Sequence, residues 1–224
     1  MHSHLNLIPV TAINRNTARR TFILIPNRIG LFGGTFDPIH NAHLRVANEA
    51  LIQCELSKVI FIPNSISPFK TNFDVTDAHH RLAMVQRAVA GNPHFDISDV
   101  EILRSGPSFT VETLRHFKSV LNKEAELFFI IGADAVAEIE KWHEFEEVLR
   151  LCKVAVVARP GTNWEQVIRE LKPATRDRIV PLKMTESDIS STMIRERAKA
   201  GLDIGDLVPK EVERYIVGNK LFIK

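Results

Sequence analysis

Short continuous apolar runs, separated by longer amphipathic stretches, constrain the fold of this chain more than any other feature. The runs "KVIFIP", "ELFFIIG" and "KVAVV" are uninterrupted and rich in β-branched or aromatic residues. Uninterrupted apolar strands are typical of a parallel sheet, because the helices that connect parallel strands cover both of its faces. The sequence therefore predicts an α/β fold.

The stretches between these runs carry helical patterns. Residues 41–53 place Leu44, Ala47 and Leu51 on one face, and residues 76–91 begin at Thr76 or Asp77 as N-cap. We expect strands at 28–32, 58–63, 126–134, 153–161 and 178–183, with a strand-like segment at 95–103. We expect helices at 41–53, 76–91, 108–121, 163–172, 190–201 and 209–219.

This alternation favours a Rossmann-like, doubly wound, mainly parallel sheet with helices on both faces. The last two helices, within about 187–224, are expected to form a small helical subdomain. In such a fold, ligands bind beyond the carboxyl ends of the strands, where the strand order reverses. Functional residues are therefore expected at the strand ends.

The chain of 224 residues suits one domain, which we place at 28–224. Residues 1–27 differ from it, because they contain arginine but no Asp or Glu. An arginine-rich, acid-poor start can be a targeting peptide, yet this one lacks the long apolar core of a secretory signal. We therefore favour a flexible or loosely packed extension, or a start assigned too far upstream.

Charge and cysteine usage exclude several classes. A net charge of +2 argues against a dedicated nucleic-acid binder. Cys54 and Cys152 lie in apolar surroundings without a CxxC motif, which indicates reduced core thiols of a cytosolic protein. No apolar run approaches the roughly 20 residues needed to span a bilayer. We expect a cytoplasmic protein without a membrane or nucleic-acid partner, and leave open whether it forms a homo-oligomer.

The most unusual segment is "GGTFDPIHNAH", which joins the first strand to the first helix. Gly33 and Gly34 predict a sharp turn and a close approach of the backbone to a ligand. His40 and His43 project from one face of the helix start, beside its N–H groups and positive dipole end. Together they predict a site for a phosphoryl group. Taken singly, the glycines fit a plain turn, and the histidines fit a surface pair or half of a metal site.

A second segment of this kind is "ISSTMIRERAKAG" near the other end of the chain. Ser190, Ser191 and Thr192 stand at a helix start, where hydroxyls and N–H groups bind phosphate oxygens. Arg195 follows one turn later and can present its guanidinium to the same anion. Alone, this motif also fits an ordinary N-cap followed by a solvated arginine.

The first segment resembles the (H/T)xGH signature of the nucleotidyltransferase superfamily, and "GGTFDPxHxxHL" is the form seen in bacterial nicotinate-nucleotide adenylyltransferases. Neither the Walker loop nor GxGxxG is present. The second segment resembles the ISSTxxR motif of the same family, which grips the β- and γ-phosphates of ATP. The similarity extends from about Arg28 to the C-terminus. One position departs from the family: Ala42 stands where the family has glycine, and adds a methyl group where the nucleotide packs closely.

Other segments resemble family motifs less completely. "FIPNSISPFK" partly matches the "PNxxPPxK" loop and implies that Lys70 faces a phosphate, although a solvated lysine is the alternative. "SGPSFTVET" resembles the segment that holds the pyridine carboxylate, which singles out Ser108 and Thr110 unless one of them is a helix N-cap. "GAD…KW" implies ribose contacts for Asp134, with an N-cap role as the alternative. It also implies that Trp142 stacks on the nicotinate ring, although such an aromatic is more often part of a core.

The resemblance assigns candidate residues to three groups. The catalytic candidates are His40, His43, Lys70 and Arg195. The ATP-binding candidates are Gly33, Gly34, Thr35, Phe36, His40, His43, Gly132, Asp134, Arg159, Ile189, Ser190, Ser191, Thr192 and Arg195. The mononucleotide-binding candidates are Gly34, Thr35, Asn64, Lys70, Ser108, Thr110, Trp142 and His143.

The resemblance implies that the chain joins ATP and nicotinate mononucleotide into deamido-NAD and pyrophosphate, in NAD biosynthesis. Mg²⁺ is expected to be held mainly by the ATP phosphates and water, with no metal ligands from the protein. No Ser-His-Asp order and no HExxH motif is present, which leaves direct phosphoryl-group chemistry without a covalent intermediate. Three alternatives remain open: nicotinamide mononucleotide as acceptor, a sister enzyme acting on phosphopantetheine or glycerol phosphate, and a non-catalytic nucleotide-binding module.

Overall fold

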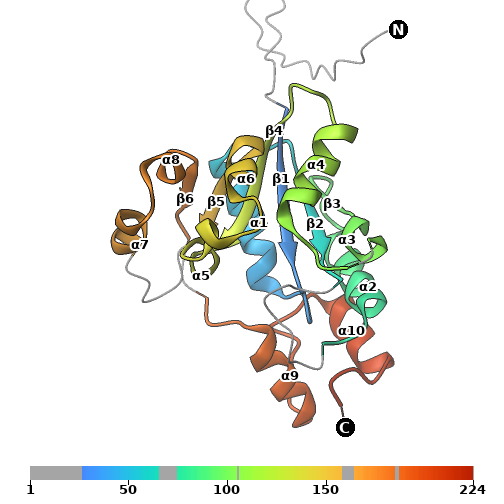
Figure 1. The fold of residues 1–224 in the computed structure, drawn as a ribbon. Coiled ribbons are helices and arrows are strands. Elements are labelled where there is room, and N and C mark those ends of the chain that lie inside the picture. The colour runs from blue at the N-terminus through green and yellow to red at the C-terminus, as the bar shows by residue number, and fades with distance from the viewer. Residues whose placement is uncertain (1–26, 66–74, 105, 158–163, 185–186, 224) are drawn as a thin grey trace, which may run out of the picture.

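A computed structural model of the protein describes residues 27–65, 75–104, 106–157, 164–184 and 187–223. Within these ranges, the chain forms a six-stranded sheet with helices packed against it (Figure 1). The strands are β1 (Arg28–Gly34), β2 (Lys58–Pro63), β3 (Phe95–Ile97), β4 (Glu126–Gly132), β5 (Cys152–Val157) and β6 (Ile179–Leu182). The helices are α1 (Asn41–Gln53), α2 (Ala78–Val89), α3 (Val100–Leu103), α4 (Thr110–Val120), α5 (Ala133–Val136), η1 (Ile139–Lys141), α6 (Phe145–Leu151), α7 (Trp164–Glu170), α8 (Pro173–Arg176), α9 (Ser191–Lys199) and α10 (Lys210–Gly218).

The strand order is β3-β2-β1-β4-β5-β6, and each neighbouring pair is parallel. This confirms the predicted α/β class, and among the described residues the sheet is parallel throughout. The chain first runs outward from β1 to β3 and then returns to place β4 on the other side of β1. The order therefore reverses between β1 and β4, so the crevice expected to bind ligands lies beyond Gly34 and Gly132.

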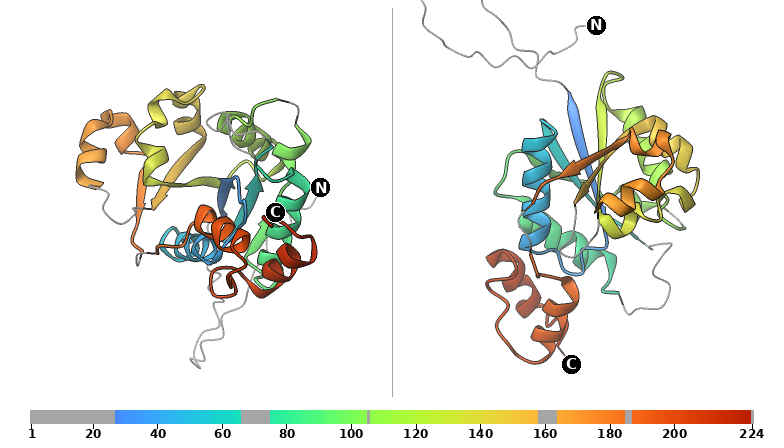
Figure 2. Two further views of the ribbon diagram at one scale, coloured as in Figure 1. Left: turned by 90° about the horizontal axis from the view of Figure 1, so that it is seen from below. Right: turned by 90° about the vertical axis from the view of Figure 1, so that its left-hand side faces the viewer.

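Side chains alternate along each strand and build one core on either face of the sheet. In β1, Ile29 and Leu31 face one cluster, whereas Phe32 belongs to the other. The cluster that contains Phe32 is covered by α1, α2 and α10, and its opposite is covered by α4, η1 and α6. Figure 2 shows helices on both sides of the twisted sheet. Because both faces of the sheet are buried, the sequences of its strands are continuous apolar runs.

The last helices, α9 and α10, lie beyond the carboxyl end of β1 (red in Figure 1). Their buried residues Ile194, Val212 and Ile216 belong to the same cluster as Phe32. The two predicted helices are thus present at this end of the sheet. The division into an extension at 1–27 and a domain at 28–224 stays a prediction, since residues 1–26 lie outside the described ranges.

Two local expectations were wrong. The strand-like segment 95–103 is a strand only up to Ile97, and α3 begins at Val100, whose N–H donates to the Ser98 hydroxyl (3.4 Å). The expected strand 126–134 ends at Gly132, which is the N-cap of α5. The structure also contains a helix that was not predicted, α6, which packs Val148 and Leu149 into the core.

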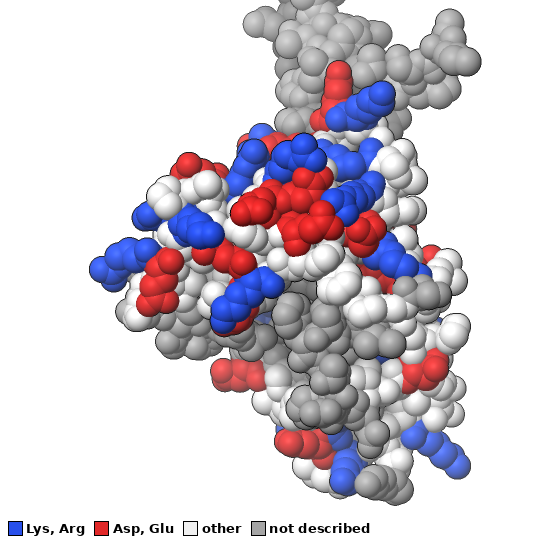
Figure 3. All heavy atoms as spheres, viewed as in Figure 1, with Lys and Arg blue, Asp and Glu red and all other residues white. Residues whose placement is uncertain are grey.

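Both cysteines are free and buried, which confirms the prediction of core thiols. Burial raises the pKa of Cys152 to about 12, so this thiol is unreactive near neutral pH. Within the described residues, no helix combines the length and apolar character needed to cross a bilayer. Acidic and basic side chains are interspersed on the face shown in Figure 3. Among the ion pairs of the protein, Arg115 pairs with Glu112 and Glu144.

Candidate active site

The connection from β1 to α1 turns sharply, but not at its glycines as predicted. Gly33 and Gly34 continue the extended strand and pair with β2. The turn comes at Phe36, whose φ is 49°, and at the cis peptide bond between Asp37 and Pro38. A Cβ on Gly34 would lie 2.8 Å from the Phe36 ring. Glycine is needed at position 34 because this ring folds back over its α-carbon.

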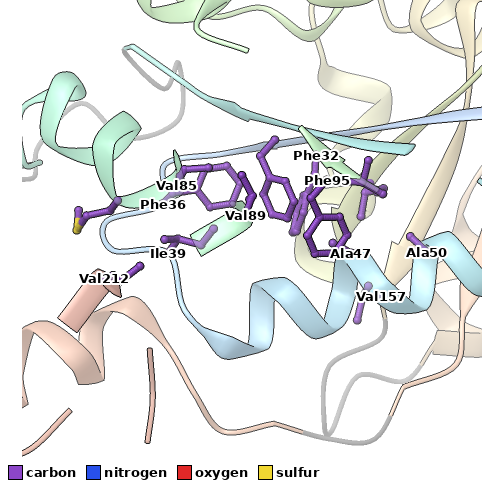
Figure 4. Close-up of a cluster of buried hydrophobic side chains, with 14 of the residues drawn as sticks. Phe32, Phe36, Ile39, Ala47, Ala50, Val85, Val89, Phe95, Val157 and Val212 are labelled. Atoms are coloured by element: carbon purple, nitrogen blue, oxygen red, sulfur yellow. The ribbon is translucent and has the colours of Figure 1, made fainter. Parts of the chain in front are cut away.

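Phe36 anchors the loop in the core. Its side chain is 2% exposed, and Figure 4 shows it in the buried cluster with Phe32, Ile39 and Val85. A residue buried this deeply contacts a ligand only through its backbone. The structure therefore restricts the expected ATP contact of Phe36 to its main-chain atoms.

The two histidines at the start of α1 stack on each other. Their ring centroids are 3.7 Å apart, with planes inclined by 26°. The backbone N–H of His40 donates to Nδ1 of His43 at 3.2 Å, and the His43 ring stands edge-on to Phe36. Because a backbone N–H only donates, His43 Nδ1 must be the acceptor, and the neutral ring then carries its proton on Nε2. In this tautomer, the donor of the His43 ring is Nε2.

The C-terminal motif reaches the same loop. Arg195 Nη1 donates to the Asp37 carbonyl (2.8 Å), and Ser191 Oγ donates to the Pro38 carbonyl (2.9 Å). A further hydrogen bond joins the start of α1 to the segment between α9 and α10, where the backbone N–H of Asn41 donates to the Leu207 carbonyl at 2.9 Å. The structure thus brings the two most distinctive motifs of the sequence together beyond the end of β1.

Some polar groups at the start of α9 form hydrogen bonds that stabilise the helix, whereas two of its main-chain N–H groups have no acceptor among the described residues. Ser190 is the N-cap, and its hydroxyl accepts from the Met193 N–H at 3.2 Å. Arg195 also donates to the Thr192 hydroxyl (3.3 Å). In the described part of the chain, the backbone N–H groups of Ser191 and Thr192 donate to no main-chain or side-chain acceptor. The predicted N-cap and the predicted anion site are therefore compatible here.

The two segments expected to hold the mononucleotide ring lie side by side. The rings of Phe109 and His143 are 4.5 Å apart, which joins the start of α4 to the residues after η1. Trp142 stands edge-on to Phe129 at 6.0 Å and is only partly buried, so it packs on the core and still exposes part of its ring. Phe109 is the N-cap of α4, so neither Ser108 nor Thr110 caps the helix.

Of the remaining candidates, Asn64 lies beside the β1 loop, where its Nδ2 donates to Thr35 Oγ1 at 3.5 Å. Gly132 ends β4 at the same crevice. The backbone of Asp134 lies inside α5 instead of capping it, and its side chain is outside what the structure describes. Lys70 and Arg159 also lie outside the described residues.

Two residues at this edge of the sheet are not among the predicted site residues. Arg81 is 1% exposed and bonds to both loops of the crevice, and Phe109 contacts His143. A signal for Arg81 was present: it shares the i, i+3, i+4 positions of the apolar face of α2 with Met84 and Val85. A charged residue at a core position of a helix indicates a buried partner network.

Comparisons with known proteins show the family to which this chain belongs. The model of the Cytidylyltransferase-like family matches residues 31–197. The nicotinate-nucleotide adenylyltransferase of Bacillus subtilis (strain 168) is 41% identical over 195 residues, which cover 87% of this chain and 98% of that protein. This chain belongs to the nicotinate-nucleotide adenylyltransferase family.

A probable member of this family from Moorella thermoacetica is 41% identical over 200 residues, covering 88% of this chain and 92% of that protein. Among solved structures, the Plasmodium falciparum nicotinic acid mononucleotide adenylyltransferase complexed with NaAD superposes with a TM-score of 0.72. That match is 19% identical and covers 88% of this chain and 97% of the other. At this identity it shows that the two proteins share a fold.

The donors that this family member gathers at its crevice are suited to anions. They are imidazole, guanidinium and main-chain N–H groups from the β1 loop and the start of α9. Within the described residues, no three His, Cys, Asp or Glu side chains stand close enough together to hold a metal ion. Mg²⁺ prefers oxygen ligands and keeps several waters. Imidazole, guanidinium and main-chain N–H donors suit the phosphate groups of a nucleotide.

Proposed function

We propose that this protein transfers the adenylyl group of ATP to nicotinate mononucleotide, forming deamido-NAD and pyrophosphate for NAD biosynthesis. The observation that carries the proposal is the 41% identity to the B. subtilis nicotinate-nucleotide adenylyltransferase over 98% of its length. The geometry supports this proposal. Ser191 and Arg195 at the start of α9 bind the loop that precedes His40, and this loop follows β1, where the strand order of the sheet reverses.

In this reaction, a phosphate oxygen of the mononucleotide attacks the α-phosphorus of ATP. A new P–O bond forms, the bond from the α-phosphorus to the β-bridging oxygen breaks, and pyrophosphate leaves with that oxygen. The attacking phosphate is already ionised near neutral pH, so no general base is required. Catalysis then depends on positioning and on stabilisation of charge.

We assign the charge-stabilising roles to residues of the two motifs. His43 is oriented to donate from Nε2 to the α-phosphate, and His40 stacks against it and holds Nδ1 through its backbone. Arg195 and the free N–H groups at the start of α9 bind the β- and γ-phosphates. Mg²⁺, bound to the ATP phosphates, supplies further neutralisation of their charge.

The acceptor side is assigned to the Phe109–His143 pair and the neighbouring Trp142. An aromatic face suits the planar pyridine ring. Main-chain N–H groups and hydroxyls of 108–110 suit its carboxylate, and the amide of nicotinamide mononucleotide lacks that charge. We therefore expect the nicotinate form to be preferred.

One assay tests the proposal against its alternatives. The purified protein is incubated with ATP, Mg²⁺ and each acceptor in turn: nicotinate mononucleotide, nicotinamide mononucleotide, phosphopantetheine and glycerol phosphate. Pyrophosphate release is measured and the dinucleotide is identified by chromatography. We expect release with nicotinate mononucleotide to be fastest. Product with phosphopantetheine alone, or no product with any acceptor, would contradict the proposal and favour a sister enzyme or a non-catalytic nucleotide-binding module.

A further inference from the structure

The buried guanidinium of Arg81 lies between the loop that follows β1 and the loop that follows β2. Arg81 is on α2, at a position that its helical period shares with Met84 and Val85, and it is 1% exposed. Arginine is rarely buried this completely unless its donors are satisfied. The acceptors of these hydrogen bonds therefore indicate the role of Arg81.

Arg81 donates hydrogen bonds to main-chain oxygens of three separate segments. Nη1 donates to the Thr35 carbonyl (2.7 Å), Nη2 to the carbonyls of Asn64 (2.7 Å) and Ser65 (3.3 Å), and Nε to the Thr76 carbonyl (2.9 Å). A longer contact joins Nη1 to the Asn64 side-chain oxygen at 3.5 Å. Thr35 follows β1, Asn64 and Ser65 follow β2, and Thr76 precedes α2. One side chain therefore links the ends of both strands to the start of a helix.

No carboxylate accepts a hydrogen bond from Arg81 among the described residues, so this is not a buried ion pair. Burial lowers the pKa of Arg81, whereas the charges of Asp37 and Asp77 raise it. The guanidinium remains protonated, because its ordinary pKa is far above neutral. Its charge is therefore balanced mainly by carbonyl dipoles. The planar fork with five donors suits this arrangement, and a lysine ammonium cannot reproduce it.

Holding these carbonyls also sets the direction of the amides that follow them. In a planar trans peptide, the C=O of one residue and the N–H of the next point in opposite directions. With the Thr35 carbonyl turned to Arg81, the Phe36 N–H points away from it, and the Ser65 N–H does the same after Asn64. In the described part of the chain, neither N–H donates to a main-chain or side-chain acceptor. Phe36 is also the residue whose buried side chain leaves only its backbone for a ligand.

We propose that Arg81 is a positioning residue of the adenylyl-transfer site. By binding the main-chain oxygens of Thr35 and Asn64, it holds the two strand-end loops in one arrangement and directs their N–H groups toward the substrate phosphates. It does not touch the substrates itself. This inference rests on the proposed function for its catalytic consequence, but the holding of the loops is independent of that function.

The first test replaces Arg81 by lysine and by alanine and measures steady-state kinetics with ATP and nicotinate mononucleotide. We expect Arg81→Lys to lower kcat by about 10- to 100-fold, because small displacements of aligned groups have effects of this size. KM for ATP should change by less than about threefold, since Arg195 and α9 stay in place. Activity of Arg81→Ala should recover at least about tenfold with added guanidinium ion, and not with methylammonium, because only guanidinium reproduces the planar donor set.

Two control variants separate positioning from general loss of stability. Val85→Ala removes a buried side chain of the same helix that packs in the cluster of Phe36 but makes no hydrogen bond to either loop, and Arg87→Lys changes an exposed arginine six residues further along. Both should keep kcat near that of the wild type once they are folded. If Val85→Ala with a matching melting temperature loses as much kcat as Arg81→Lys, the proposed role is wrong. A wild-type kcat in Arg81→Lys, or a guanidinium effect no larger than that of methylammonium, would equally contradict it.

Amide hydrogen exchange tests the loops without relying on activity. In Arg81→Lys, peptides that cover 33–38 and 62–65 should exchange faster than in the wild type, whereas peptides from β4 and β5 should keep their protection. Unchanged exchange in both loops would overturn the inference even if activity fell. If the wild type formed no dinucleotide, the proposed function would fail, and the exchange result would still decide whether Arg81 holds the loops.

Discussion

At the scale of single residues, the orientation of His43 is the most consequential feature of the site. Its Nδ1 accepts the His40 N–H, which leaves Nε2 as the donor. We expect His43→Ala to lower kcat by at least about 100-fold, as for the loss of one donor to a transition-state charge. His43→Gln should retain more activity than His43→Asn, because the Gln amide nitrogen reaches nearer to the position of Nε2.

The measurement for His43 is kcat at saturating ATP and nicotinate mononucleotide, with His79→Ala as a control. His79 is an exposed histidine at the start of α2 and bonds only to Asp77 among the described residues. The His79→Ala variant should therefore keep the kcat of the wild type. Near-normal turnover in His43→Ala would remove the assigned role.

Ala42 is the residue at which this chain departs from the motif of its family. Its exposed fraction is 9%, so its methyl group packs largely within the protein in the first turn of α1. We expect Ala42→Gly to leave KM for ATP within about twofold and to lower the free energy of unfolding by about 0.5–1 kcal/mol, the usual cost of glycine in a helix. Steady-state kinetics and urea unfolding test both parts. A fall in KM of tenfold or more would instead show that the methyl group obstructs the nucleotide.

At the scale of elements, the short helix α3 is tied to α4 through a buried carboxyl group. Glu101 is 5% exposed and accepts from the Thr113 hydroxyl at 2.6 Å. Burial raises the pKa of Glu101 above its ordinary 4.5, although Thr113, Ser108 and Arg104 oppose this. The contact lies directly beside the segment proposed to bind the mononucleotide carboxylate.

This raised pKa predicts a pH dependence of stability. The folded state binds the Glu101 proton more tightly than the unfolded state, so the free energy of unfolding falls as the pH rises from about 4.5 through the raised pKa. Glu101→Gln stays neutral and keeps an oxygen for Thr113, so it should lack this fall. Urea unfolding of both proteins between pH 4.5 and 8 gives the difference. Parallel curves over this range would show that Glu101 does not titrate differently in the folded state.

At the scale of the whole molecule, the C-terminal helices share a core with the sheet. Ile216 of α10 is 1% exposed and belongs to the cluster of Phe32 and Val85, whereas both tryptophans pack against the cluster on the opposite face. We expect Ile216→Ala to lower the free energy of unfolding by about 2–5 kcal/mol. If the two faces unfold together, tryptophan fluorescence and far-UV circular dichroism should shift to the same lower denaturant midpoint.

The two probes distinguish one cooperative unit from two. A fluorescence midpoint that stayed at the wild-type value, while circular dichroism changed, would show that the C-terminal part unfolds separately. Leu202→Ala is a suitable control, since Leu202 lies just after α9 and its side chain is 56% exposed. It should shift neither midpoint appreciably.

Much of the fold could be predicted from local patterns. The strands at 58–63 and 126–132 and the helix at 41–53 are visible in sequence because burial on two faces, or on one stripe, imposes a repeat on neighbouring residues. The exceptions are short. A four-residue helix such as α3 contains one turn, which is too short for a helical period to be recognised.

The candidate site also contains some features that local patterns predict and others that they do not. The histidines, the serines of α9 and Arg195 are predicted as site residues from their types and spacing, because anion chemistry and helix starts favour particular residues at particular offsets. Sequence alone therefore determined the α/β class, the family and the two motifs. Only the tertiary structure decided that Arg195 binds the Asp37 carbonyl, that the turn lies at Phe36, and that Arg81 joins two strand ends. Those contacts connect residues far apart in the chain, and their partners are main-chain oxygens, which every residue carries and no sequence pattern marks.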